Sequence, residues 1–262
     1  MGVRPIWPTH GSLFSGIGGF DLGFERAGIK TLWQVEIDDY AQNVLAKWFP
    51  EAERHRDVRD CGSHNLRYVD IISGGFPCTD ISPAGKRAGI GGEHSRLWRE
   101  MARIVGELRP RYVVVENSAD LLIPGRGMEE VLGDLAALGF DAEWSVLSAC
   151  AFGAPHTRKR VFILAYPNGT EFGQLRGKQC EEGCEEAGHL CWQGLEPPVA
   201  RVVDGVPHRV DRLRGCGNAV VPQIAEFIGK SIVEFENNGR AIGPRIGASG
   251  QDNGRKTYAE NQ

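Results

Sequence analysis

Cys78 is the residue of this chain whose surroundings most suggest a nucleophile. It follows the apolar run Val69–Ser73 across a Gly-Gly-Phe-Pro turn, which predicts a thiol displayed at a strand end. A thiolate attacks carbon well when nearby cations lower its pKa, and Lys86 and Arg87 follow in the same region. The ordinary role of a lone cysteine is that of a small buried hydrophobe. The loop around Cys78 therefore favours the nucleophile.

Glu116 and two arginines would complete such a site. Glu116 ends the apolar run Tyr112–Glu116, so its carboxyl is expected beside the Cys78 loop if the two strands are neighbours. Burial there would raise its pKa and make it a proton donor. Arg158 and Arg160 alternate at the start of a later strand, so they share a face and suit a carbonyl oxygen or a carboxylate. A structural salt bridge and a solvated basic turn are the alternatives.

A glycine-rich turn, Phe14-Ser-Gly-Ile-Gly-Gly-Phe20, joins the first predicted strand and helix. Its glycines permit close approach of a ligand, and the helix N-terminus behind it favours an anionic group. Glu36 ends the next strand, where ribose hydroxyls lie in nucleotide-binding βαβ units, and Asp57 could accept a hydrogen bond from an adenine amino group. Asp21 replaces the third glycine of the dinucleotide motif. The pattern predicts a nucleoside cofactor without separating NAD from S-adenosylmethionine.

Alternating strands and helices are expected to position these groups. The predicted strands are Ser12–Phe14, Thr31–Glu36, Val69–Ser73, Tyr112–Glu116, Glu143–Ser148 and Val161–Ala165. The predicted helices are Gly19–Ala27, Asp39–Phe49, Arg96–Leu108 and Met128–Leu138. Such alternation predicts an α/β fold with a mostly parallel sheet flanked by helices. Ligands of such folds bind at the carboxyl ends of the strands, where the candidate residues lie.

The alternation stops after Ala165 and divides the chain. We expect a catalytic and cofactor-binding core over 9–165 and a small irregular insert over 166–208. A closing segment over 209–236 returns to the core through a helix that starts near Pro222, and a disordered polar tail follows over 237–262. The insert holds a zinc alternative with unusual spacing, so we predict no metal site there; its four residues are Cys180, Cys184, His189 and Cys191.

Composition sets the broad class. The chain of 262 residues has room for one large domain and has no apolar stretch of about 18 residues that would span a membrane. It opens without an apolar signal region, and its seven cysteines do not suggest a disulfide framework, so we expect a cytoplasmic protein. The net charge of -4 argues against unspecific coating of nucleic acid. Basic segments at 84–111 and 158–160 still suit a polyanion partner.

Five segments resemble, in order, the motifs of the DNA (cytosine-5) methyltransferase family in a short prokaryotic or phage-type form. The similarity runs over about residues 11–233. FSGIGGFDLGFERAG is similar to the methyl-donor loop, GGFPCTDIS to the catalytic Pro-Cys loop, VVVENS to the Glu-Asn segment, FGAPHTRKRVFILA to the Gln-x-Arg-x-Arg segment and RLRGCGNAVVPQ to the closing Gly-Asn motif. The resemblance implies a Rossmann-like methyltransferase fold with a small target-recognition insert.

By position, the resemblance implies methyl transfer from S-adenosylmethionine to carbon 5 of cytosine in double-stranded DNA, on a base flipped out of the helix. It makes Cys78 the nucleophile on ring C6, Glu116 the partner of ring N3, and Arg158 and Arg160 the holders of the base and the glutamate. The implied cofactor-binding residues are Phe14, Gly16, Gly18, Glu36, Asp57, Pro77, Leu97 and Asn218. The implied DNA-binding residues are Ser82, Lys86, Arg87 and His156.

The sequence departs from the family at several positions. His156 stands where the family usually has Gln, Ser118 where it commonly has Val, and the segment before Arg212 does not match. The short insert implies a short or relaxed target. A tRNA cytosine-5 methyltransferase with the same core, or a catalytically silent DNA-binding homologue, are the alternatives, and a plain NAD oxidoreductase would need no Pro-Cys loop. We expect a nucleoid-associated monomer, with a cognate restriction endonuclease as a candidate partner.

Overall fold

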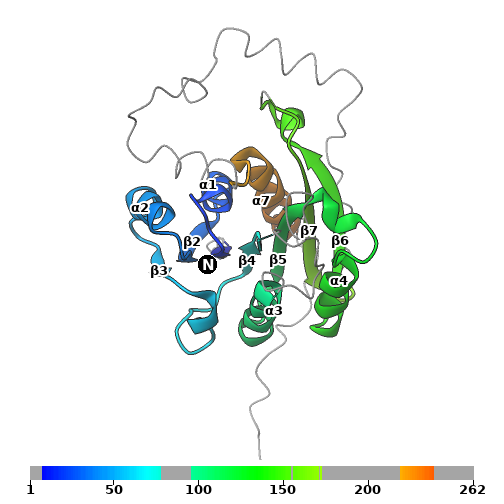
Figure 1. Cartoon of the computed structure of the whole chain (residues 1–262), viewed down its shortest axis with the longest axis horizontal. Helices are drawn as coiled ribbons and strands as arrows, with labels where there is room; N and C mark the ends of the chain where they lie inside the picture. The colour runs from blue at the N-terminus through cyan, green and yellow to red at the C-terminus, as the bar shows by residue number, and fades with distance from the viewer. Residues whose placement is uncertain (1–7, 78–95, 155, 171, 173–218, 239–262) are drawn as a thin grey trace, which may run out of the picture.

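The computed structural model describes residues 8–77, 96–154, 156–170, 172 and 219–238 (Figure 1). Their seven strands form one sheet in the order β3-β2-β1-β4-β5-β7-β6. The strands are β1 Thr9–Leu13, β2 Lys30–Val35, β3 Glu53–His55, β4 Ile71–Gly74, β5 Tyr112–Ser118, β6 Phe140–Ser148 and β7 Lys159–Pro167. Neighbours from β3 to β5 are parallel, whereas β7 is antiparallel to β5 and β6. The predicted mostly parallel α/β sheet is confirmed.

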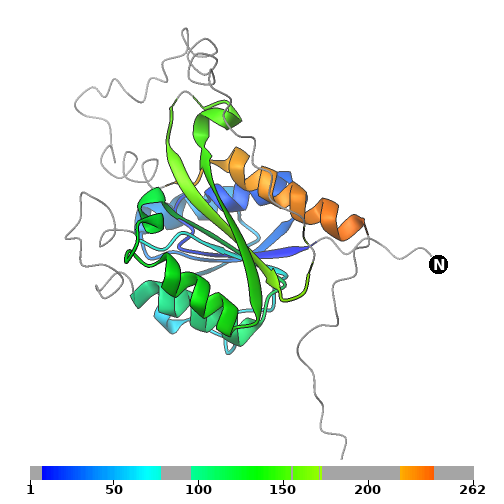
Figure 2. The same cartoon turned by 90° about the vertical axis from the view of Figure 1, so that its right-hand side faces the viewer.

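Helices cover both faces of the sheet, with α1 and α7 on one and α3 and α4 on the other (Figure 2). The α-helices are α1 Gly19–Arg26, α2 Asp39–Trp48, α3 Arg96–Leu108, α4 Met128–Ala137 and α7 Pro222–Asn237. Short 3-10 helices are η1 Val58–Asp60, η3 Ala119–Leu122 and η4 Ala149–Phe152. No helix in the part of the chain that the structure describes is long and apolar enough to cross a membrane.

The strand bounds differ from the predicted ones by up to three residues, and β1 and β3 show physical reasons. β1 starts at Thr9, before the predicted Ser12. The prediction started too late because the buried side chains of His10 and Ser12 are polar and interrupt the apolar pattern. Phe14 leaves the strand with a φ of 53°, in the left-handed region, so the turn begins one residue earlier than expected. The three-residue β3 is absent from the predicted apolar runs because none of its side chains is fully buried, although a strand end was expected next to Asp57.

The alternation of side chains along β5 decides which face each group reaches. Val113 and Val115 pack in the core that α3 and α4 cover, whereas Tyr112 and Val114 pack in the core of α1 and α7. Glu116 lies on the same face as Tyr112 and Val114, near the carboxyl end of the strand. The C-terminal end of α7 is anchored at the opposite end of β5, where the Glu236 carboxylate accepts hydrogen bonds from Arg111 and, at 2.6 Å, from the Tyr112 hydroxyl.

Two glycines of α1 allow the last helix to lie against the first. An ideal Cβ at Gly19 would be 2.3 Å from the carbonyl oxygen of Val220, and one at Gly23 would be 2.4 Å from that of Pro222. Backbone of the segment that leads into α7 therefore occupies the space of both side chains. We expected the glycines of the turn to admit a ligand, but the close approach at Gly19 is made by the protein's own chain.

Alanine at Gly19 should therefore destabilise the protein. The new methyl group meets backbone, so the start of α7 must move, and overpacking of this kind costs about 1–3 kcal/mol. Urea unfolding would measure the loss as a lower midpoint. Gly133→Ala is the matched control, because this exposed glycine of α4 has no atom within 4 Å of its ideal Cβ. It should gain up to about 1 kcal/mol from helix propensity. Equal stability of the Gly19 variant and the wild type would refute the packing.

Candidate active site

The loop that leads to Cys78 passes directly against Glu116. β4 and β5 are parallel neighbours with Gly74 opposite Val115, so Gly75 lies beside the end of β5. An ideal Cβ at Gly75 would be 2.9 Å from Glu116 Oε2, which means that a larger residue would press on the carboxylate. Pro77 is half-buried and is the last described residue of this loop; Cys78 itself lies outside the described residues.

Asn117 ties the same loop to β5. Its buried Nδ2 donates a hydrogen bond of 3.1 Å to the carbonyl oxygen of Phe76, two residues before Cys78. The Phe76 ring packs on Trp98 of α3, with ring centroids 5.5 Å apart. The path of the chain up to Pro77 is therefore held from both β5 and α3. Sequence reasoning assigned no role to Asn117, although a polar residue next to Glu116 at the end of an apolar strand was a usable signal.

The structure brings both arginines to one oxygen of Glu116. Arg160 Nε lies 3.2 Å and Arg158 Nη2 lies 4.0 Å from Glu116 Oε1, and the glutamate is 7% exposed. The Arg160 contact is an ion pair without hydrogen-bond geometry, so Oε1 accepts no hydrogen bond from any described residue. A buried oxygen of this kind is costly unless a partner such as a bound molecule satisfies it.

Burial dominates the protonation of Glu116. Removal from water raises the pKa of its carboxyl, and the nearby guanidiniums of Arg160 and Arg158 oppose this without reversing it. The carboxyl therefore keeps its proton to a higher pH than an exposed glutamate does. A buried carboxyl that keeps its proton, beside two guanidiniums at a strand end, suits protonation of a ring nitrogen.

The glycine-rich turn divides into one open position and others that pack. Gly16 has a φ of 54° and no atom within 4 Å of its ideal Cβ, so the backbone there faces open space. Gly18 has a φ of 88°, and its ideal Cβ would be 2.6 Å from the Phe49 ring behind α2. Of the turn's glycines at 16, 18 and 19, only Gly16 has open space at the position of a Cβ.

Glu36 holds this turn in shape. Its Oε2 accepts a hydrogen bond of 2.7 Å from the Gly16 amide, and its Oε1 accepts one of 2.8 Å from the Asp38 amide. The Gly16 amide is thus already paired within the protein. Next to Glu36, the side chain of Ile37 is 62% exposed, an apolar surface that the sequence analysis did not single out.

Asp57 lies close to the end of β2, because the Glu36 amide donates a hydrogen bond to the carbonyl oxygen of His55. Its carboxylate accepts hydrogen bonds from the Arg59 amide at 3.0 Å and from the Arg59 Nε at 2.9 Å. The hydrogen bonds from Arg59 lower the pKa of Asp57, so the group is an ionised acceptor. The structure therefore gathers Gly16, Glu36 and Asp57 at the carboxyl ends of β1, β2 and β3.

The other predicted residues fall into two groups. Leu97 is half-buried in the first turn of α3, and His156 is exposed ahead of β7. The residues outside the described part are Ser82, Lys86, Arg87, Asn218, Cys180, Cys184, His189 and Cys191. Within the described ranges, no three His, Cys, Asp or Glu side chains group as ligands of a metal.

Asp21 is a buried acid directly behind the glycine-rich turn. Its Oδ1 accepts a hydrogen bond of 2.9 Å from Gln34 Nε2, while Oδ2 accepts none from the part of the chain that the structure describes. Burial raises the pKa of Asp21 from 3.8 to about 6. The unfolded chain therefore loses this proton at lower pH than the folded protein does. The resulting loss of stability sets in as the pH rises from about 4 to 6 and persists above.

Asp21→Asn should consequently stabilise the protein at pH 8 but not at pH 4. A pKa difference of about two units corresponds to about 3 kcal/mol, and asparagine stays neutral while still accepting from Gln34. Urea midpoints at both pH values would measure the gain. Asp39→Asn, at an exposed position of α2, is the control without a comparable change. A variant less stable than wild type at pH 8 would contradict an ionised, unpaired Asp21.

Comparison with known proteins agrees with this geometry. The family described as C-5 cytosine-specific DNA methylase matches residues 9–187. Type II methyltransferase M.NgoFVII of Neisseria gonorrhoeae is 32% identical over 165 residues, which are 62% of this chain and 44% of that protein. Type II methyltransferase M2.BsuMI of Bacillus subtilis is 35% identical over 160 residues, which are 59% of this chain and 41% of that protein. The chain thus matches less than half the length of these relatives.

A solved structure supports the fold. The Entamoeba histolytica methyltransferase EhMeth superposes with a TM-score of 0.56 at 17% identity, over 67% of this chain and 57% of that one. The sheet therefore has the Rossmann-like architecture of the methyltransferases. The family match over most of the described core agrees with this fold. The order of the strands and the placement of the motifs at their carboxyl ends agree with it as well. The chain belongs to the C-5 cytosine-specific DNA methylase family.

Proposed function

We propose that the protein transfers a methyl group from S-adenosylmethionine to carbon 5 of cytosine in double-stranded DNA. The observation that carries this proposal is Glu116, a buried carboxyl with raised pKa, flanked by Arg158 and Arg160 and touching the loop that leads to Cys78. Family membership and the names of the Type II relatives support it.

The residues at the ends of β1 to β3 fit a nucleoside methyl donor. Gly16 leaves space where a side chain would stand, Ile37 offers an exposed apolar surface, and Asp57 is an ionised acceptor. When bound, S-adenosylmethionine supplies an electrophilic methyl group. We assign its contacts to Phe14, Gly16, Gly18, Glu36, Asp57, Pro77, Leu97 and Asn218, and add Ile37.

The side chains would activate the cytosine. The Cys78 thiolate forms a bond to C6 while N3 takes the proton of Glu116, so the electrons of the C5–C6 double bond become available at C5. Arg158 and Arg160 would hold the base and the glutamate that has lost its proton. Once C5 carries the methyl group, its hydrogen leaves as a proton to a base, the C5–C6 double bond re-forms and the thiolate departs. N3 returns its proton to Glu116, which restores the donor. Cysteine suits both steps because a thiolate attacks and leaves readily.

The base has to leave the helix for this chemistry, because C6 and N3 are stacked and paired in duplex DNA. Flipping costs a few kcal/mol, which contacts to the backbone and grooves must offset. We assign such contacts to Ser82, Lys86, Arg87 and His156. Residues 166–208 would serve as the target-recognition insert, and 209–236 would close the core. A cognate restriction endonuclease, monomeric action and a location at the nucleoid belong to the same proposal.

A paired substrate assay tests the function. The protein is incubated with S-adenosylmethionine that carries a tritiated methyl group and with either duplex DNA or tRNA, and bisulfite sequencing of the DNA then locates the product. Methylation of cytosine in DNA is expected. Label in tRNA alone would replace the proposal by the tRNA methyltransferase. DNA binding without transfer to either substrate would identify a silent homologue.

A further inference from the structure

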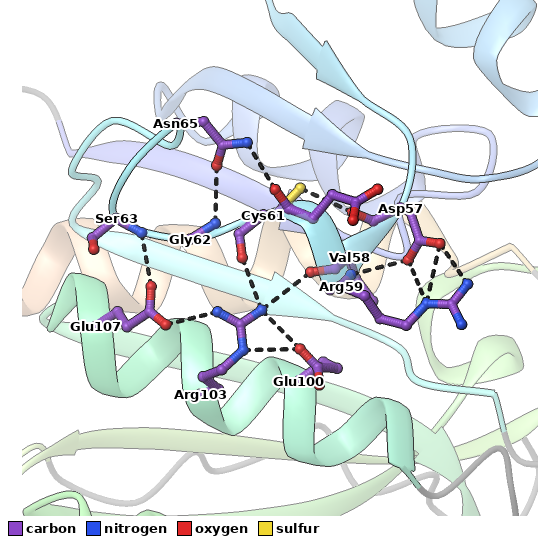
Figure 3. A network of polar contacts seen from close by, with 11 residues as sticks. Asp57, Val58, Arg59, Cys61, Gly62, Ser63, Asn65, Glu100, Arg103 and Glu107 are labelled. Atoms are coloured by element: carbon purple, nitrogen blue, oxygen red, sulfur yellow. Dashed lines mark hydrogen bonds and ion pairs between the residues drawn. The ribbon is translucent and has the colours of Figure 1, made fainter.

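Arg103 of α3 joins this helix to the turn that carries Asp57 (Figure 3). Its Nη2 donates hydrogen bonds to two backbone carbonyl oxygens of that turn, Val58 at 3.3 Å and Cys61 at 2.8 Å. Its Nε donates to Glu100 at 2.9 Å and its Nη1 to Glu107 at 2.7 Å. Every nitrogen of the guanidinium is used, and the two glutamates of α3 fix its orientation toward the turn.

Glu107 makes a second connection to the same turn. Its Oε2 accepts a hydrogen bond of 2.8 Å from the Ser63 amide, and an ideal Cβ at Gly62 would be 2.5 Å from that oxygen. Asn65 closes the turn on itself, since its side chain accepts from the Gly62 amide and donates to the Asp60 carbonyl oxygen. Figure 3 shows these contacts together with the separate hydrogen bonds between Arg59 and the Asp57 carboxylate.

The placement of this connection suggests more than helix stabilisation. An ion pair along one helix needs no backbone partner on another segment. Arg103 nevertheless donates hydrogen bonds from its Nη2 to the carbonyl oxygens of Val58 and Cys61. Val58 directly follows Asp57, and Leu97 lies on α3 about 1.7 turns before Arg103. Our proposed function assigns both Asp57 and Leu97 to the cofactor site. The Arg103 guanidinium connects the segment that carries Asp57 to the helix that carries Leu97.

We propose that Arg103 is a positioning residue that sets the spacing of the Asp57 turn from α3, and through it the affinity for the adenosine half of S-adenosylmethionine. The proposal rests on the proposed function for the identity of the cofactor. It concerns binding alone, because Arg103 lies on the cofactor side and takes no part in the contacts among Glu116, Arg158 and Arg160.

Calorimetric binding of two probes tests this inference without any DNA. S-adenosylhomocysteine and 5′-methylthioadenosine share the adenosine half, and only the first carries the amino-acid half. Arg103→Met keeps much of the side-chain length but makes none of the hydrogen bonds. It should lower the affinity for both probes by the same factor of about ten. Arg103→Lys keeps the charge but cannot serve two carbonyls and two carboxylates together, so it should recover only part of the loss.

Controls separate this role from general stability. Arg109→Met removes another arginine of the same region that donates to a backbone carbonyl, that of Leu138 at 2.8 Å, away from the Asp57 turn. It should bind both probes as the wild type does, and urea midpoints would confirm that each variant is folded at the temperature used. At saturating S-adenosylmethionine, the Arg103 variants should keep kcat within about threefold and an unchanged KM for DNA.

Each outcome decides the matter. Unchanged affinity in Arg103→Met, full recovery in Arg103→Lys, or a loss confined to S-adenosylhomocysteine would overturn the positioning role. A fall in kcat with unchanged probe affinity would also overturn it and place Arg103 in another part of the reaction. If the wild type binds neither probe, the proposed function fails as well, and the two failures are thereby distinguished.

Discussion

Alanine in place of Cys78 is expected to abolish methyl transfer to duplex DNA while S-adenosylhomocysteine still binds with wild-type affinity. Carbon 5 of cytosine is a poor nucleophile, and only addition of the thiolate at C6 makes its electrons available. The backbone up to Pro77 is held by Asn117 and by the packing of Phe76, so removal of a sulfur atom beyond it should leave the cofactor site intact. Tritium transfer measures the first effect and calorimetry the second.

A matched cysteine and a modified base sharpen this test. Cys150→Ala changes a half-buried thiol of η4 that has no role in the proposed chemistry, and it should retain activity. DNA with 5-fluorocytosine should trap the wild type in a covalent complex, since C5 then carries no proton whose loss would release the thiolate. Cys78→Ala should form no such complex. Residual transfer by Cys78→Ala at more than a few percent would rule out the covalent route.

Glutamine at position 116 should lower kcat by about 10²–10⁴-fold, the range for loss of a positioned proton donor. Glutamine keeps the shape of the side chain but has no acidic proton for N3, and it leaves Arg158 and Arg160 without their carboxylate. Single-turnover rates at saturating DNA and cofactor measure the effect on the chemical step. Binding of S-adenosylhomocysteine should not change, because Glu116 belongs to the base side of the site.

The pH profile adds a second readout for Glu116. Burial raises the pKa of its carboxyl, so the protonated donor is present below that pKa and is lost as the pH rises through it. Wild-type single-turnover rates should fall on the alkaline side for this reason, and the residual rate of Glu116→Gln should lack that limb. Glu129→Gln, on the exposed first turn of α4, is the control that should match the wild type in both rate and profile. A wild-type rate in the Glu116 variant would exclude proton donation by this residue.

Local patterns were enough to predict the α/β class and the candidate catalytic groups. Apolar runs and helical periods depend on residues close in the chain, so the start of the strand at Tyr112 and the helix Arg96–Leu108 were placed correctly. Polar strands escaped the same reasoning. The buried His10 of β1 forms side-chain hydrogen bonds across the sheet, at 3.0 Å with Thr31 and at 2.8 Å with Ser73, and no apolar pattern marks such a strand.

By itself, then, the order of residues determined which side chains could do chemistry and that they would stand at strand ends. It could not determine which glycine has open space at its side-chain position, because that depends on what distant segments bring near Gly16 and Gly19. The insertion of β7 between β5 and β6, which carries Arg160 to Glu116, and the reach of Arg103 to the Asp57 turn depend equally on tertiary packing. The physical reason is the same in each case: close contacts and burial are properties of pairs of segments, and the pKa of Glu116 follows from them.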